Sequence, residues 1–172
     1  SIDGMKLFFC GKDRFDNLGG EDIFEVNINQ SRSTKAKIIQ SLSTEYSNEA
    51  PLAISADGNS MLLWTSENGG DLQRSIRLSD GGWSNPMSFE SPINSPYYEG
   101  DAMLSADGKA LFFTSTRPGG RNFYTENNFH YFGDDNYPTD IYVCNLKTDG
   151  TWSEPINLGK KINTSYSERT PY

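Results

Sequence analysis

Short apolar runs, each following a small polar turn, are the clearest pattern in this chain of 172 residues. Runs of consecutive apolar residues occur at 7–9, 61–63 and 111–113, and each follows an Asp-Gly pair after two intervening residues. Asp-Gly favours a tight turn, because glycine adopts positive φ and the aspartate side chain can bond the backbone two residues on. A run without alternation is typical of a strand that is covered on both faces. The pattern therefore predicts a buried strand after each turn.

The turn and the strand belong to a longer repeat that occurs three times. Each copy continues with a Gly-Gly pair, a second strand and a closing polar segment, and we place the copies at 1–54, 55–104 and 105–172. The second strands are expected at 22–26, 75–78 and 140–143. Residues 35–41 carry a weak helical pattern that a strand fits equally well. A small sheet cannot bury both faces alone, so repetition indicates radial stacking. We predict an all-β fold: one β-propeller segment, 1–172, of three four-stranded antiparallel blades.

The repeat pattern starts and stops part-way through a blade. The first residues resemble the second strand of a blade without its first strand, and residues 168–172 are expected to start the innermost strand of a next blade. Propellers use about four to eight blades, so three do not close a ring. We expect half of a six-bladed ring whose remaining blades lie elsewhere in a parent chain. The alternative is that a second copy supplies them, each end completing its partner's blade.

Composition and charge argue against several classes of partner and site. The net charge is −8, and an acidic surface repels phosphate backbones, which argues against nucleic acid as a partner. No apolar run approaches the roughly 20 residues of a membrane-spanning helix, so we expect no membrane insertion by this segment. Cys10 and Cys144 have neither CxxC spacing nor histidine neighbours, which argues against structural zinc. We expect two small buried hydrophobic side chains rather than a disulfide, and we predict no metal and no cofactor.

One insertion falls outside the repeat. Residues 121–138 separate the Gly-Gly pair of the third copy from its next strand, so they are expected on one rim of the blade. Long loops on rigid scaffolds often carry function, and aromatic rings beside amides and carboxylates suit peptide or sugar recognition. The alternative is a loop that folds over the rim and seals a neighbouring blade. The candidate contact residues are Phe123, Tyr124, Phe129, His130, Tyr131, Asp134, Asp135 and Tyr137.

Acidic residues near the end of this insertion raise the question of Ca²⁺. Asp134, Asp135, Asn136 and Asp140 offer oxygen atoms, and Ca²⁺ takes about six to eight of them. Their spacing does not match an EF-hand, and Asp140 already belongs to the repeat. We therefore expect a solvated acidic turn.

Other carboxylates recur in phase with the repeat. Glu49, Glu99 and Glu168 could form an array for acid–base chemistry, but recurrence in every copy favours a structural role. We expect each to accept backbone amides where an inner strand begins. Asp101 is expected to face the central channel, with no visible partner. His130 is the only histidine and no G-x-S-x-G is present, so we predict no catalytic residues and no enzyme activity.

The motifs of the third copy, taken in their order along the chain, resemble those of a known repeat family. The third copy carries S-x-D-G, S-x-R-P-G-G, D-I-Y, D-G-x-W-S-x-P-x-N-L-G, I-N-T and E-x-x-P at 105–108, 115–120, 140–142, 149–159, 162–164 and 168–171. This series resembles the TolB-type, WD-like β-propeller repeat. The first copy matches at both ends, whereas the second lacks Arg-Pro before its glycines and Asp-Ile-Tyr after them.

The resemblance carries expectations about context and function. It implies a periplasmic or outer-membrane-associated protein, in a family often found beside OmpA-like peptidoglycan-binding domains. It also implies a non-catalytic scaffold or protein-interaction module of the bacterial cell envelope, with a protein as partner. The alternative function is a glycan-binding module or glycan-active propeller enzyme that uses residues 121–138.

Overall fold

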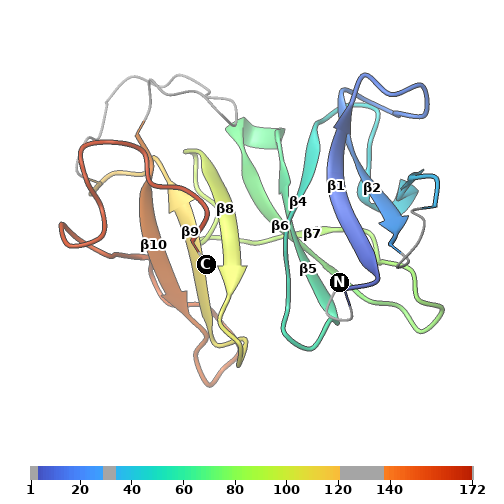
Figure 1. Cartoon of the computed structure of the whole chain (residues 1–172). Helices are drawn as coiled ribbons and strands as arrows, with labels where there is room; N and C mark the ends of the chain where they lie inside the picture. The colour runs from blue at the N-terminus through green and yellow to red at the C-terminus, as the bar shows by residue number, and fades with distance from the viewer. Residues whose placement is uncertain (1–3, 29–33, 121–137, 172) are drawn as a thin grey trace.

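The computed structural model describes residues 4–28, 34–120 and 138–171. These ranges form three antiparallel sheets arranged side by side (Figure 1). The first sheet holds β1 (Lys6–Lys12), β2 (Glu21–Asn27) and β3 (Lys37–Ile38). The second holds β4 (Glu49–Ile54), β5 (Ser60–Thr65), β6 (Asp71–Ile76) and β7 (Met87–Ser88). The third holds β8 (Glu99–Leu104), β9 (Ala110–Ser115), β10 (Asp140–Asn145) and β11 (Ile156–Asn157). Two short 3₁₀ turns are η1 (Gln40–Leu42) and η2 (Glu67–Gly69).

The sheets confirm the predicted fold class. Strands follow one another in space as they do in sequence, and β4 and β8 contact each other across the sheets, so these first strands are the inner ones. The second and third sheets have the predicted four strands. The first sheet has three in the described residues, and β1 is its edge strand. No helix in the described ranges has the length and apolar character needed to span a membrane.

The S-x-D-G turn is held by its own side chains. In the third repeat, Ser105 Oγ donates to Asp107 Oδ1 at 2.6 Å and accepts the backbone N–H of Ala110 at 2.9 Å. Gly108 lies at φ +70°, in the left-handed region that other residues avoid. Ser55 makes the same two contacts in the second repeat. The short motif therefore fixes the reversal between inner strand and second strand.

Gly108→Ala is expected to lower the free energy of unfolding by about 1–2 kcal/mol. A Cβ atom at this position meets no atom within 4 Å, so the cost comes from the positive φ and not from a clash. Urea unfolding measures it, with Lys109→Ala as the neighbouring exposed control. A Gly108→Ala variant as stable as that control would show that the turn relaxes.

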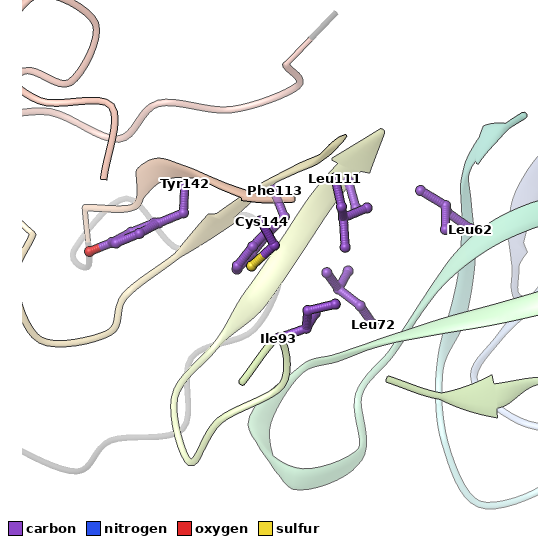
Figure 2. Packing of buried hydrophobic residues seen from close by; sticks show 8 residues of the cluster. Leu62, Leu72, Ile93, Leu111, Phe113, Tyr142 and Cys144 are labelled. Atoms are coloured by element: carbon purple, nitrogen blue, oxygen red, sulfur yellow. The ribbon is translucent and has the colours of Figure 1, made fainter. Parts of the chain in front are cut away.

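Two apolar clusters hold the sheets together. Between the second and third sheets, β6 contributes Leu72 and β9 contributes Leu111 and Phe113, all 0% exposed (Figure 2). Between the first and second sheets lie Ile23, Leu42, Met61, Leu63 and Trp83. The strand β5 therefore buries both of its faces, with Leu62 in one cluster and Met61 and Leu63 in the other, which explains its unbroken apolar run. The burial predicted for the run at 7–9 was wrong, because β1 is an edge strand and its Leu7 is 49% exposed.

Three local predictions need correction. The strand expected at 75–78 is β6, which starts at Asp71, because Asp71 and Leu72 take the register that Asp-Ile holds in the other sheets. Within 35–41 the structure has β3 and the start of η1. Cys144 is buried as expected, but Cys10 is exposed, because it lies on the edge strand β1; both thiols are free.

Candidate functional site: an aromatic rim

The candidate contact residues of the insertion lie outside the described residues. These are Phe123, Tyr124, Phe129, His130, Tyr131, Asp134, Asp135 and Tyr137. The flanking strands are described: β9 ends at Ser115 and β10 begins at Asp140. The inner strands β4 and β8 begin at this same end of the sheets, since neighbouring strands are antiparallel. We call this end, with its connecting loops, the upper rim (Figure 1).

A tyrosine recurs on the upper rim in every repeat. Each lies two residues after a Ser or Thr whose hydroxyl accepts the tyrosine N–H, at 3.4, 3.3 and 3.1 Å for Tyr46, Tyr97 and Tyr166. Tyr46 is 93% exposed and Tyr166 is 78% exposed, whereas Tyr97 is partly buried. The loop between β1 and β2 adds Phe15, which is 84% exposed. The rim therefore presents aromatic rings from a fixed backbone geometry.

The recurring glutamates anchor these same loops. The backbone N–H of Thr44 donates to Glu49 at 3.1 Å, and that of Ser95 donates to Glu99 at 2.9 Å. In the third repeat, the backbone N–H of Thr164 donates to Glu168 at 2.9 Å. The expected acceptance of backbone amides at the start of each inner strand is thus confirmed. Burial raises the pKa of Glu49 and Glu99 above the ordinary value. Hydrogen bonds from Ser47 and Thr44 oppose the rise in the pKa of Glu49, and the Arg117 cation, followed by hydrogen bonds from Ser95 and Ser115, opposes it for Glu99.

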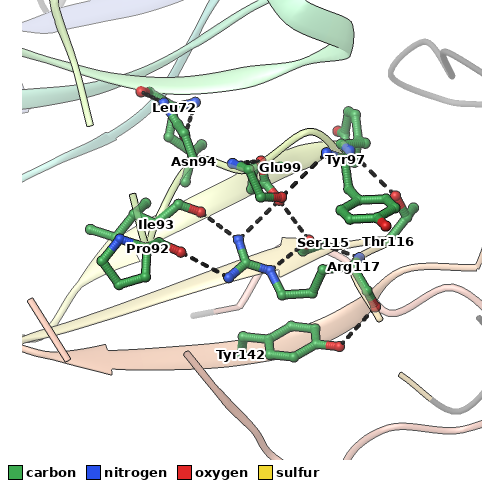
Figure 3. Close-up of polar contacts among 12 residues, drawn as sticks. Leu72, Pro92, Ile93, Asn94, Tyr97, Glu99, Ser115, Thr116, Arg117 and Tyr142 are labelled. Carbon is green, nitrogen blue, oxygen red and sulfur yellow. Dashed lines mark hydrogen bonds and ion pairs between the residues drawn. The ribbon is translucent and has the colours of Figure 1, made fainter. Parts of the chain in front are cut away.

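The arginine of the S-x-R-P motif is part of the same anchor in the third sheet. Arg117 Nη2 lies 2.9 Å from Glu99 Oε1, and its Nε donates to Ser115 Oγ at 3.0 Å. Its Nη1 donates to the Pro92 carbonyl at 3.0 Å, and Nη2 also donates to the Ile93 carbonyl (Figure 3). The cation therefore ties the loop before β8 to the end of β9.

An asparagine joins the closing segments of the second and third repeats to the sheet before them. Asn94 accepts the N–H of Leu72 and donates to its carbonyl, both at 2.9 Å. Asn163 does the same to Ile141, at 2.9 and 3.0 Å. The first repeat has Ser43 instead, which accepts only an N–H of β2, at 3.1 Å. These bonds fix the height of the rim loops relative to the strands.

The remaining acidic candidates have structural partners. Asp101 is 7% exposed, and it accepts the backbone N–H of Thr170 and lies near Arg169. The expectation of no partner was therefore wrong, because residues 168–171 lie beside it. Burial raises the pKa of Asp101, and both contacts oppose that rise.

The residues considered as Ca²⁺ ligands, for which a solvated acidic turn was expected instead, are mostly outside the described part of the chain. Asp140 accepts a hydrogen bond from Asn157 at 2.7 Å within the third sheet. Asp134, Asp135 and Asn136 lie outside the described residues. In the parts of the chain that the structure describes, no group of three metal-binding side chains occurs.

A pocket of about 380 Å³ lies at the opposite end, between the second and third sheets. The two S-A-D-G turns line it together with Arg74, Phe89 and Trp152. Phe89 and Trp152 meet edge to face, with ring centroids 6.4 Å apart. Arg74 Nη2 donates to Ser60 Oγ at 2.7 Å. Aromatic surface beside a cation and carboxylates suits a small polar ligand.

Sequence comparison does not assign this chain: no family model and no curated protein matches it. Comparison of structures does find relatives. A post-proline cleaving enzyme from Rickettsia typhi aligns over 95% of this chain and 21% of its own, with 15% identity and a TM-score of 0.43. That similarity is too weak to support an argument.

A protein described as a TolB from Agrobacterium tumefaciens gives a stronger structural match. It aligns with 92% of this chain and 47% of its own, at 19% identity and a TM-score of 0.60. This chain thus spans about half the length of that structure. At such identity the match establishes the fold and not the activity. Together with the three stacked sheets, it shows that this chain folds as a TolB-like β-propeller segment.

Proposed function

We propose that this chain is a non-catalytic interaction module of a bacterial cell-envelope protein, and that its upper rim contacts a protein partner. The observation that carries the proposal is the exposed tyrosine repeated at one structural position, Tyr46 and Tyr166 above all. Tyrosine is enriched at interfaces because it combines a large apolar ring with a hydroxyl. The TolB-like fold supports a periplasmic or outer-membrane-associated location indirectly.

The burial of the rim glutamates supports the non-catalytic part of this proposal. A general acid or base needs a carboxyl that can reach a substrate. Glu49 and Glu99 are 2% and 0% exposed, and their oxygens are engaged by backbone and hydroxyl donors. These residues shape the rim loops.

A second candidate function is glycan binding. The pocket at the opposite end supports it, because the rings of Phe89 and Trp152 and the carboxylates of Asp57 and Asp107 line the same cavity. Sugars commonly stack on aromatic rings and hydrogen-bond to carboxylates. This function would use a different surface from the rim, so the two candidates are separable by mutation.

Tyr46→Ser combined with Tyr166→Ser is expected to lower partner capture about tenfold or more, since interface tyrosines are often binding hot spots. The immobilised chain is incubated with a solubilised envelope fraction, and the retained protein is identified and quantified by mass spectrometry. Met87→Ser is the control, because Met87 is also apolar and 61% exposed but lies on the outer strand β7.

Three outcomes are informative. Loss of one retained protein in the tyrosine variant alone supports the rim proposal. Equal capture by both variants contradicts it. Saturable binding of peptidoglycan fragments in calorimetry, abolished by Trp152→Ala, would favour the glycan function instead.

A further inference from the structure

The third sheet contains a complete interaction between an inner strand and its neighbour. Glu99, at the start of β8, pairs with Arg117 at 2.9 Å and accepts the Ser115 hydroxyl at 2.8 Å. The Arg117 guanidinium lies over the stacked rings of Phe113 and Tyr142, 4.9 and 5.5 Å from their centroids. Cation, ring pair and glutamate thus form one unit.

The first sheet contains the same unit without its glutamate. Phe9 and Phe24 form a stacked pair in the register of the pair in the third sheet. Arg14 lies over these rings, 5.9 and 4.4 Å from their centroids. Its described ion pair is with Asp16 of its own loop, at 3.3 Å. Among the described residues no strand lies on the outer side of β1, the place where β8 presents its glutamate in the third sheet.

Residues 168–171 already have the backbone conformation of an inner strand. The N–H of Glu168 donates to the carbonyl before β10 at 2.8 Å, as the N–H of Glu99 donates to the carbonyl before β6 at 2.9 Å. Thr170 has φ +44°, and Asp101, which also lies two residues past its glutamate, has φ +42°. The segment is therefore arranged to enter a sheet.

The carboxylate of Glu168 is only half satisfied. Oε1 accepts the backbone N–H of Thr164 at 2.9 Å, as expected for this repeat. Oε2 is buried and has no hydrogen-bond partner in the described part of the chain. In the third sheet the corresponding glutamate receives Ser115 and Arg117 from the neighbouring strand. Glu168 lacks the partners that a neighbouring strand supplies.

The outward-facing sides of the first and third sheets are also incompletely covered. Leu7 of the first sheet is 49% exposed, whereas its equivalents Met61 and Leu111 are 0% exposed. On the third sheet, Ile141 is half-buried, whereas its equivalent Leu72 is fully buried. Apolar sheet faces of this kind normally pack against another layer.

We propose that residues 168–171 of one copy of this chain bind along β1 of a second copy, with Glu168 of one copy paired to Arg14 of the other. The matching charges and the preformed strand identify the occupant. A two-fold axis would place two such contacts in one dimer and cover both outer faces.

Charge exchange tests this contact. The chain alone should have twice its 19.2 kDa mass in light scattering after size exclusion. Arg14→Glu and Glu168→Arg, made separately, should each weaken self-association by about 30-fold or more at each contact. An equimolar mixture of the two variants should recover the dimer, because both of its contacts again join opposite charges. Recovery also demonstrates that each variant is folded.

The result can go against the proposal in two ways. A single-copy mass from micromolar concentration to the solubility limit would overturn it. A dimer that neither single variant weakens, or that the mixture fails to restore, would overturn the Arg14–Glu168 contact. Arg14→Glu leaves Tyr46, Tyr166 and the glutamates that anchor their loops unchanged, so partner capture by the upper rim is measured independently with that variant.

Discussion

Glu99→Gln is expected to lower the free energy of unfolding by about 3–5 kcal/mol at neutral pH. The exchange keeps the size of the side chain and one carbonyl acceptor, but it removes the anion that faces Arg117. The Glu99 side chain is 0% exposed and that of Arg117 is 10% exposed, so the guanidinium would be left without a counter-ion away from water. Urea unfolding followed by tryptophan fluorescence measures the change.

Glu49→Gln is the matched control for that variant. Glu49 is 2% exposed and holds the equivalent position in the second sheet, but its hydrogen-bond donors are Thr44 and Ser47. Position 67, where the third sheet has its arginine, is a glutamate here. We therefore expect a cost of about 1 kcal/mol for Glu49→Gln. Equal costs for the two variants would contradict the importance of the Arg117 ion pair.

A double-mutant cycle isolates the pair itself. Arg117→Met together with Glu99→Gln removes both charges, so it should cost clearly less than the sum of the single costs. Additive costs would mean that the two side chains act separately, through their contacts with Ser115 and the Pro92 carbonyl.

Local chemistry explains why much of the fold was predictable. The S-x-D-G turn is held by bonds within six residues, so its sequence specifies its structure wherever it occurs. The unbroken runs at 61–63 and 111–113 predicted burial on both faces, and the run at 61–63 does lie between two sheets. In the run at 111–113, Leu111 and Phe113 are buried against the second sheet, whereas Phe112 on the other face is half-buried. The strand β6 was placed too late because Asp71 is polar, and its burial becomes clear only from its register opposite Thr65.

Less of the candidate site could be predicted from the sequence. A signal for the rim tyrosines was present, since Tyr46, Tyr97 and Tyr166 each follow a Ser or Thr by two residues. The insertion attracted attention instead because it breaks the repeat. The pairing of Arg117 with Glu99 joins positions 18 residues apart through a shared sheet, so no local pattern indicates it. The pocket beside Trp152 likewise depends on how two sheets meet.

Leu72→Ala is expected to lower the free energy of unfolding by about 2–5 kcal/mol, because it opens a cavity in the core between the second and third sheets. Leu72 is 0% exposed and packs in one cluster with Leu111 and Phe113 (Figure 2). Calorimetry or urea unfolding measures the loss. Ile76→Ala on the same strand is the control, since Ile76 is 43% exposed and should change stability by about 0.5 kcal/mol or less.

Alanine at the positions equivalent to Leu72 in the first and third sheets tests how much the stacking of sheets contributes to the free energy of unfolding. Ile23→Ala should cost about as much as Leu72→Ala, because Ile23 is also 0% exposed and faces the second sheet. Ile141→Ala should cost less in an isolated chain, because Ile141 is only half-buried. If sheets are stabilised by their neighbours, the cost of Ile141→Ala should rise with chain concentration as a second copy covers that face. Equal costs at all three positions, independent of concentration, would mean that each sheet carries its own stability without radial stacking.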